Sequence, residues 1–372
     1  MPKLKELCIL ITDGEHGSVN DDKNGSCYLL SNKNLNNGFI TIDESDRKIR
    51  TETKNKLNNR TKIGKNTILI STVGTIGKLA FIDNDDINYS FQRSVGIIKP
   101  NPDTINPYFL YSLLQTSEYQ ERFAQMASGS VQKCIFIGGL EDLDIKSYPA
   151  DKQNQIGKTF HDLDMLIKNN MDVICSLTNK IKDTYSYFMP KQVGEKRKLS
   201  EFVSIINETY SGEDNLPLID LSIIPSNSLI VSNLNKSDKL NTNLKKLKMG
   251  DFLFGSIRPY LKKSIVSPIE GLTTGTVIQM RPRISTMNNF LLGLLTSESF
   301  FEFAINNSTG TKMPVVKAKD LINYEFIYNK DFVEWFEKQN NYFELIISLL
   351  NENFKLNEYK QLLLSTLFKQ RL

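Results

Sequence analysis

Histidine and tryptophan are the scarcest residues of this 372-residue chain, which has 2 His, 1 Trp and 4 Cys. The two histidines are too few for a zinc site of the usual Cys/His kind, and no C-x-x-C pair is present to supply thiolate ligands. The cysteines are also too scattered for a disulfide framework, and a reducing cytoplasmic location is therefore expected. They are Cys8, Cys27, Cys134 and Cys175.

Long hydrophobic runs are missing as well. No apolar stretch approaches the roughly 20 residues that span a bilayer, and residues 1–12 lack the apolar core of a signal peptide. We expect no membrane association. The charge is nearly balanced, with 46 Lys and Arg against 42 Asp and Glu. A net charge of +4 permits nucleic-acid binding without requiring it.

Several enzyme motifs are present only in part. Residues 72–79 resemble a phosphate-binding loop, but the first glycine is missing and Leu79 stands where a magnesium-binding Ser or Thr is needed. Residues 106–109 have one proline of the N-P-P-Y/F motif of amino-methyltransferases, without a glycine-rich turn for S-adenosylmethionine. The acid-x-Lys triplets at 144–146 and 358–360 are short enough to occur by chance. We expect no catalytic, cofactor-binding or metal-binding residues in this chain.

The longest periodic segment runs from residue 151 to residue 189. Most of its apolar residues recur at alternating steps of four and three, the heptad pattern of a coiled coil. The positions are Ile156, Phe160, Leu163, Ile167, Asn170, Ile174, Leu177, Ile181, Thr184 and Phe188. Pro190 follows and ends the pattern. A helix of about 50 Å is predicted, and it needs a long partner because isolated helices are marginal in water.

The partner is expected in the same chain, because residues 335–372 lack Pro and Gly and repeat the pattern. The apolar positions of this heptad pattern are Phe336, Phe343, Ile347, Leu350, Phe354, Leu364 and Phe368. Its polar positions are Asn340, Asn357 and Gln361. Phe188 and Phe368 are separated by 368 − 188 = 180 residues, as are Ile167 and Ile347. Either segment alone is also compatible with an ordinary amphipathic core helix. Two segments in register favour an internal duplication.

The segments before each helix also repeat. Residues 66–71 correspond to 250–255, an offset of 250 − 66 = 184, and Thr-Ser-Glu at 116–118 recurs at 296–298. Strands are predicted at 67–72, 79–82 and 94–98, and a helix at 108–125. The predicted class is α+β, with two mixed α/β domains, two long antiparallel coiled-coil helices and an internal pseudo-two-fold repeat. The predicted domains are residues 1–150 and 191–333, and the helices are 151–190 and 334–372.

Taken in order, these elements resemble the specificity subunit of Type I restriction-modification systems over essentially the whole chain. The resemblance rests on residues 11–17 (ITDGEHG), Gly250-Asp251 with its weaker copy Asn66-Thr67, the turn at 74–78 (GTIGK), the loop at 128–132 (SGSVQ) and Gln155-Ile156 before the heptads. The second copy departs from this pattern, because Arg258-Pro259-Tyr260 replaces the glycine turn. A differently shaped loop is expected there.

The resemblance implies a non-catalytic subunit that reads an asymmetric, bipartite double-stranded DNA site, with one target-recognition domain for each half-site. Two modification (methyltransferase) subunits would dock on the helices, and restriction subunits would join them. S-adenosylmethionine, ATP and magnesium would bind in those partners. From the residue types that contact DNA, the candidates are Lys78, Arg93, Gln132, Lys133, Arg258, Lys262, Lys263 and Lys312. The helix-seam and partner candidates are Ile167, Ile174, Ile181, Ile347, Phe354 and Phe368.

Two questions stay open at this point. A scaffold protein, whose paired domains bind protein instead of DNA, explains the heptads and the duplication equally well. His16 lies in a glycine-flanked turn, where it either supports the turn or contacts DNA. His161 follows the seam residue Phe160 and is expected on the flank of the helix. The sequence reveals neither the recognised bases nor the spacer length.

Overall fold

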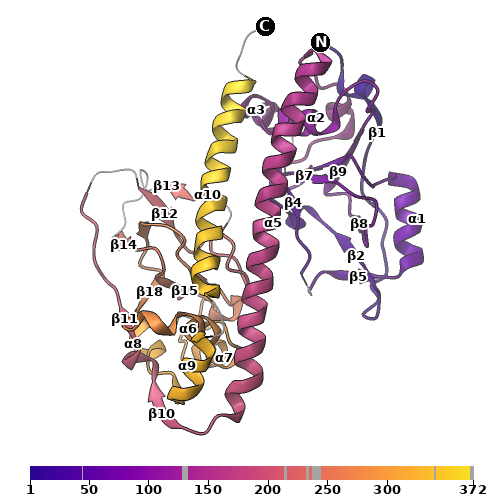
Figure 1. Cartoon of the computed structure of the whole chain (residues 1–372). Helices are drawn as coiled ribbons and strands as arrows, with labels where there is room; N and C mark the ends of the chain where they lie inside the picture. Colours follow the sequence, from indigo (N-terminus) through magenta and orange to yellow (C-terminus); the bar gives the residue numbers. More distant parts are fainter. Residues whose placement is uncertain are drawn as a thin grey trace. The chain divides into compact units, whose positions relative to one another are not determined.

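The structure of the chain is a computed structural model that describes residues 1–43, 45–127, 133–212, 216–231, 234–236, 244–338 and 341–368. The chain divides into two compact units, residues 1–166 with 358–372 and residues 167–357. The long helices α5 (Ala150–Phe188) and α10 (Tyr342–Leu367) each contribute one stretch to each unit (Figure 1). The units therefore differ in extent from the predicted domains, because each sheet-bearing part shares its core with both helices.

The first unit is built on a four-stranded antiparallel sheet in the order β1-β9-β6-β7. The strands are β1 (Cys8–Asp13), β6 (Thr67–Ser71), β7 (Leu79–Ile82) and β9 (Val95–Pro100). All residues of β6 are buried, which fits a short apolar strand that is covered on both faces. The three strands predicted for this region are confirmed.

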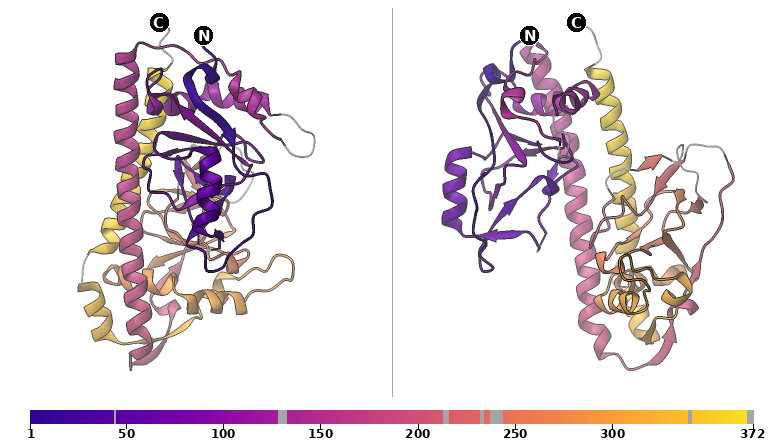
Figure 2. Two further views of the ribbon diagram at one scale, coloured as in Figure 1. Left: turned by 90° about the vertical axis from the view of Figure 1, so that its right-hand side faces the viewer. Right: turned by 180° about the vertical axis from the view of Figure 1, so that it is seen from behind.

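A three-stranded sheet completes the first unit. Strand β2 (Cys27–Leu30) pairs antiparallel with β5 (Arg47–Ile49) and parallel with β8 (Tyr89–Phe91). Helix α1 (Thr51–Thr61) contacts β2 and β8 and lies on the side away from α5 (Figure 2). The smaller elements are η1 (Leu4–Leu7), η2 (Asn32–Asn34), β3 (Leu35–Asn36), β4 (Phe39–Ile40) and α4 (Ile137–Glu141).

The segment predicted as one helix at 108–125 forms two helices, α2 (Pro107–Leu114) and α3 (Ser117–Met126). The prediction of a single helix is wrong at Thr116, whose backbone is extended and whose hydroxyl donates to the Leu113 carbonyl at 2.8 Å. That bond offers the chain an alternative to the helical ladder. The start of α2 is as predicted, because the Asn106 side chain accepts from the Phe109 N–H at 2.9 Å.

The second unit repeats the topology of the first. Its main sheet has the antiparallel order β11-β18-β15-β16, formed by β11 (Val203–Ile205), β15 (Phe252–Gly255), β16 (Ser264–Val266) and β18 (Val277–Pro282). In its other sheet, β12 (Pro217–Ile219) pairs parallel with β17 (Gly271–Thr273), as β2 does with β8. β13 (Asn235–Lys236) and β14 (Lys245–Leu247) flank this pair. The predicted internal repeat is thus present as strand topology.

Helices and short elements of the second unit follow the same order. Helices α6 (Asn288–Leu295), α7 (Glu298–Asn306) and α8 (Ala318–Leu321) correspond to α2, α3 and α4. Strands β10 (Glu195–Lys198) and β19 (Glu325–Tyr328) form a separate antiparallel pair. The short helices are η3 (Met189–Lys191), η4 (Leu199–Glu201), η5 (Pro259–Leu261) and η6 (Ser285–Met287).

The buried face of α5 follows the predicted heptad only in part. Apart from Gly157, its buried residues are Ile156, Phe160, Asp164, Ile167, Asn170, Ile174, Thr178, Ile181 and Tyr185. Asp164, Thr178 and Tyr185 thus take the place of the predicted Leu163, Leu177 and Thr184, which are half-buried. A helix has 3.6 residues per turn, so its buried stripe drifts away from a strict heptad. Tyr185 is also needed elsewhere, because its ring packs against Phe290 of α6 at 5.5 Å.

The C-terminal segment is not the single helix predicted for 334–372. It forms α9 (Lys330–Lys338) and then α10. The first turn of α10 is fastened to α6, because the Phe343 N–H donates to Asn289 Oδ1 at 2.9 Å. Glu337 of α9 accepts from the Phe290 N–H at 2.7 Å. The predicted seam residue Asn340 lies outside the described residues, and Gln361 is exposed while its neighbour Lys360 is buried.

Within each unit α5 and α10 run antiparallel, as predicted. In the first unit the ring of Phe160 stacks on that of Phe368 at 6.1 Å, and Asp164 meets Lys360 at 2.7 Å. In the second unit the amide of Asn170 donates to Asn353 at 2.9 Å. Residue numbers rise along one helix as they fall along the other.

Candidate nucleic-acid interface

Three loops meet at one end of the main sheet in the first unit. The β6–β7 turn (residues 72–78) bonds to the β8–β9 loop, because the Thr72 N–H donates to the Ser94 carbonyl at 3.0 Å. The same turn bonds to the segment after α3, where the Ile135 N–H donates to the Thr72 carbonyl at 2.9 Å and the Gly74 N–H to the Lys133 carbonyl at 3.3 Å. We call these three loops the first loop cluster.

The second unit has the same arrangement of backbone contacts. The Ser256 N–H donates to the Thr276 carbonyl, and the Val316 N–H donates to the Ser256 carbonyl, both at 3.0 Å. The Arg258 N–H donates to the Pro314 carbonyl at 2.7 Å. The β15–β16 turn (residues 256–263), the β17–β18 loop and the segment after α7 therefore form a second loop cluster, equivalent to the first.

The turns of the two clusters share two left-handed backbone positions with different side chains. In the first cluster these are Gly74 (φ +77°) and Gly77 (φ +85°). In the second they are Arg258 (φ +53°) and Lys262 (φ +51°), on either side of η5. The second turn is therefore shaped differently, as expected, but it keeps a conformation that favours glycine.

The predicted DNA-binding residues of the first domain lie on the first loop cluster or beside it. Arg93 and Lys133 are exposed. Lys78 is half-buried, and its ammonium donates to Asn36 Oδ1 at 3.4 Å. Gln132 lies outside the described residues. The backbone contacts of the turn bring the loops of Arg93 and Lys133 together, so the cations share one surface.

The predicted DNA-binding residues of the second domain lie on the second loop cluster. Its lysines differ in whether their ammonium groups are paired within the protein or exposed to solvent. The Lys262 ammonium pairs with Glu298 at 2.5 Å. The Lys263 ammonium donates to the Leu221 carbonyl at 2.8 Å, and burial lowers the pKa of Lys263. Lys312 is exposed. Of these lysines, Lys312 is the one whose charge stands in solvent.

The sequence reasoning missed the residues that support the first loop cluster from behind. The Asn32 amide donates to the Val73 carbonyl at 2.6 Å. The Arg60 guanidinium donates to the Gly14 carbonyl at 2.7 Å, and the Arg93 N–H donates to the Glu15 carbonyl at 3.0 Å. Arg60 and Asn32 lie in polar stretches without any pattern, so the sequence held no signal for them.

Residues 13–16 act as a structural turn in this unit. His16 Nε2 lies 2.7 Å from Asp13 Oδ2, which supports the turn reading of this histidine. A Cβ atom at Gly14 would lie 2.3 Å from the carbonyl oxygens of Phe91 and Gln92, closer than any such contact tolerates. Glycine is therefore required where this turn crosses the β8–β9 loop.

We expect Gly14→Ala to destabilise the first unit by about 2–3 kcal/mol, because the new methyl group displaces the backbone of the β8–β9 loop. Thermal unfolding followed by circular dichroism measures the loss. Gly138→Ala is the matched control, because a Cβ there meets no described atom within 4 Å, and it should leave stability unchanged or slightly higher. Equal unfolding temperatures for the two variants would contradict the close approach of Gly14 to the β8–β9 loop.

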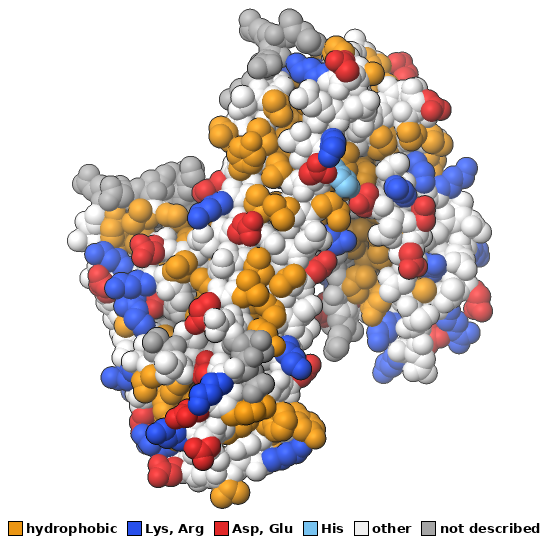
Figure 3. All heavy atoms as spheres, in the orientation of Figure 1, with side chains coloured by type: hydrophobic (Ala, Val, Ile, Leu, Met, Phe, Trp, Pro, Cys, Tyr) orange, Lys and Arg blue, Asp and Glu red, His pale blue; other side chains and the backbone are white. Residues whose placement is uncertain are grey.

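The predicted seam residues are all buried: Ile167, Ile174, Ile181, Ile347, Phe354 and Phe368. They hold the helices and the domain cores together and do not offer a surface. Large apolar side chains that are exposed on the same helices are Leu166, Val173 and Tyr187 on α5 and Leu345, Tyr359 and Leu362 on α10. Figure 3 shows hydrophobic side chains gathered over the region of these helices. Any partner of the helices would meet these residues first.

Two polar contacts interrupt the apolar seam. In the second unit, Asn353 accepts from Asn170 at 2.9 Å and donates to the Ile167 carbonyl at 3.3 Å. In the first unit, Asp164 binds the Lys360 ammonium and the Tyr108 hydroxyl, each at 2.7 Å. Burial, followed by the charge of Asp164, raises the pKa of Tyr108. Polar contacts of this kind fix the register of paired helices.

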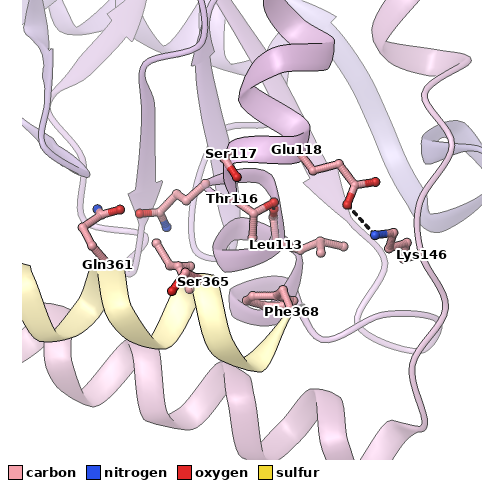
Figure 4. A pocket seen from close by; sticks show the side chains of 10 residues that line it. Leu113, Thr116, Ser117, Glu118, Lys146, Gln361, Ser365 and Phe368 are labelled. Carbon is pink, nitrogen blue, oxygen red and sulfur yellow. Dashed lines mark hydrogen bonds and ion pairs between the residues drawn. The ribbon is translucent and has the colours of Figure 1, made fainter. Parts of the chain in front are cut away.

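The motifs that resemble enzyme sites have structural roles here. Asn106 caps α2, and Asp144 pairs with Lys3 at 2.9 Å. Lys146 pairs with Glu118 at the edge of a cavity of about 120 Å³ in the first unit (Figure 4). Leu113, Leu364 of α10 and Phe368, which follows α10, are its apolar lining residues. None of the residues known to line this cavity is a histidine or a cysteine.

The Gly250-Asp251 element also has a structural explanation. Gly250 has a left-handed backbone (φ +88°). The buried Asp251 carboxylate accepts from the Arg281 guanidinium at 2.6 and 2.7 Å and from the Lys248 N–H at 2.8 Å. The hydrogen bonds to Asp251 raise the pKa of Arg281. This pair ties the turn before β15 to β18.

Two absences hold for the residues that the structure describes. No group of three or more His, Cys, Asp or Glu side chains is placed to hold a metal ion among them. Nor does any helix within the described ranges have the length and apolar character needed to cross a membrane.

Comparison with known proteins relates part of this chain to a described protein family. Residues 3–178 match the family described as Type I restriction modification DNA specificity domain. The specificity subunit of the Type I restriction enzyme EcoBI from Escherichia coli is 27% identical over 136 residues, which cover 37% of this chain and 28% of that protein. The putative MjaX specificity subunit of Methanocaldococcus jannaschii is 27% identical over 147 residues, covering 36% and 35%. The chain thus spans about a third of the length of these relatives.

Among solved structures, the S subunit of the Type I restriction-modification system from M. genitalium has a similar fold. The TM-score is 0.54 at 16% sequence identity, and the match covers 100% of this chain and 96% of that chain. At this identity the likeness concerns the fold. It extends over both units, whereas the family match ends within α5.

Proposed function

We propose that this chain is the DNA-recognition subunit of a Type I restriction-modification complex, since residues 3–178 match the Type I restriction modification DNA specificity domain family. It reads a bipartite duplex site, with one loop cluster for each half-site. The observation that carries this proposal is the duplicated loop cluster. Each copy presents basic side chains on loops that are held together by the same backbone hydrogen bonds.

The two half-sites should differ in sequence. The first turn carries Gly74 and Gly77 where the second carries Arg258 and Lys262, so the two clusters offer different donors to base edges. Exposed lysines such as Lys133 and Lys312 suit phosphate contacts, which give affinity without sequence preference. The expected target is therefore asymmetric and split by a spacer.

Catalysis belongs to partner subunits in this proposal. Two modification subunits dock on the helices and bring S-adenosylmethionine, and restriction subunits bring ATP and magnesium; the complex works in the cytoplasm. The modification subunits extract the target adenine, because a base within a duplex is out of reach. The exposed apolar residues Leu166, Val173, Leu345, Tyr359 and Leu362 support a docking role for α5 and α10.

Binding of the assembled complex to mixed-sequence duplex DNA across a salt series tests the DNA proposal. The logarithm of the binding constant should fall linearly with the logarithm of salt concentration, with a slope of about −0.9 for each phosphate contact. Lys133→Ala and Lys312→Ala should each reduce the slope by about 1. Binding that is absent at low salt would contradict the proposal.

A protein scaffold is the second candidate, favoured by the exposed apolar residues of the two helices. In that case the domains bind protein, and the loop cations are ordinary surface charges. The salt series separates the candidates, because a scaffold should show hardly any DNA binding at 50 mM salt.

A further inference from the structure

The arginines of the described part of the chain fall into two groups. Arg47, Arg50, Arg60, Arg122, Arg197, Arg281 and Arg283 each donate to a carboxylate or a carbonyl. Arg93 and Arg258 are the exceptions. Neither guanidinium has a hydrogen bond or an ion pair with any residue that the structure describes, and Arg258 Nε is buried without an acceptor. Buried donors are normally satisfied, so such a group calls for an explanation.

The position of the two exceptions is not random. Arg93 lies on the β8–β9 loop of the first loop cluster, next to Ser94, whose carbonyl accepts from Thr72. Arg258 lies in the β15–β16 turn of the second cluster, directly before η5. Each loop cluster therefore holds one arginine whose guanidinium has no hydrogen-bond acceptor among the described residues.

The backbone conformation of Arg258 favours glycine over arginine. Its φ of +53° is a conformation that glycine adopts without steric cost, and glycine does occupy the equivalent position of the first cluster, at Gly74. The Arg258 N–H bond to the Pro314 carbonyl at 2.7 Å holds this conformation. Since the turn favours glycine and the sequence has arginine, the backbone of the turn gives no reason for this side chain. Strained residues of this kind concentrate at functional sites.

We propose that Arg258 and Arg93 are base-reading residues, each recognising a guanine in the half-site of its own domain. The inference rests on the proposed DNA-recognition function. A free guanidinium fork matches the O6 and N7 acceptors of guanine in the major groove. Because Arg258 Nε has no acceptor, the side chain gives up no hydrogen bond there when it turns toward a base. Nearby lysines supply the phosphate contacts.

The experiment selects bound sequences from a randomised duplex pool with the full chain assembled with its modification subunits. The wild-type complex should enrich a split motif with a guanine in each half-site. Arg258→Gly should lower the preference for one guanine, in one half-site only, by roughly 10- to 100-fold. Arg93→Ala should do the same in the other half-site. Each variant is thus the control for the other.

Two further measurements separate base reading from structure and from charge. Arg258→Gly should unfold at the wild-type temperature or above, because glycine fits φ +53°. Arg258→Lys should also relax the guanine position, because lysine keeps the charge but loses the fork, and lysine tolerates this backbone at Lys262. A folded Arg258→Gly complex with an unchanged motif would overturn the inference, as would uniform weakening on all sequences or loss of the entire half-site. A wild-type motif without guanine in one half-site would overturn the inference alone. Enrichment of no motif at all would overturn the proposed function with it.

Discussion

Replacing Lys360 with methionine is expected to destabilise the first unit by about 3–5 kcal/mol, because it leaves the Asp164 carboxylate buried without a cation. The two side chains are each 6% exposed, and their charged atoms lie 2.7 Å apart. The Tyr108 hydroxyl would remain as the carboxylate's hydrogen-bond donor, at 2.7 Å. Denaturant unfolding of the whole chain, followed by circular dichroism, measures the effect.

Lys355→Met is the matched control, because Lys355 is an exposed lysine of the same helix. Its loss should stay within about 0.5 kcal/mol. Adding Asp164→Asn to Lys360→Met should recover a large part of the loss, because the amide oxygen still accepts from Tyr108 and the stranded charge is gone. Equal stability of Lys360→Met and Lys355→Met would show that the pair does not hold α10 against α5 within the first unit.

A charge placed at Ile167 should have an effect of similar size on the second unit. Ile167 is 3% exposed, so Ile167→Asp buries a carboxylate that has no cation to pair with there, and the expected loss is about 3 kcal/mol or more. Trp335, the one tryptophan of the sequence, lies in α9 of this unit and reports its unfolding by fluorescence. Ile347→Asp, at the partner position of the duplicated heptad, should behave alike.

The neighbouring residue provides the control and a second readout. Leu166 is 41% exposed, so Leu166→Asp should leave the unfolding transition within about 0.5 kcal/mol of wild type. It should nevertheless weaken assembly with modification subunits if the exposed apolar residues of α5 form the docking surface. If Leu166→Asp unfolds the protein and Ile167→Asp does not, the buried face of α5 is assigned incorrectly.

The sequence predicted the architecture because the signals that carry it are periodic or repeated. The heptads of α5, the apolar runs of β6 and β7 and the repeat of Thr-Ser-Glu at 180 residues needed no tertiary information. The predictions that failed concerned features that depend on contacts with segments far away in the sequence. Asp164 is buried because Lys360, 196 residues away, supplies its counter-charge. The first turn of α10 is bonded to Asn289 of α6, which lies 54 residues away.

The candidate interface was predictable in location but not in detail. Loop positions of Arg93, Lys133, Arg258 and Lys312 follow from their places between predicted strands and helices. The sequence does not indicate which of these cations form ion pairs within the protein. Lys262, for example, pairs with Glu298 of another element. Equally, no pattern in the sequence indicates that Arg258 adopts a left-handed backbone, since that position is defined by the contact with Pro314.

Under the proposed function, this chain directs methylation to a bipartite DNA site. Co-expression of the chain with modification subunits, followed by genome-wide mapping of methylated adenines, tests it most directly. The expected result is a split, asymmetric motif with one methylated adenine on each strand, in which the two halves are read by different loop clusters. A purified complex that methylates no site, or that methylates without sequence preference, would contradict it.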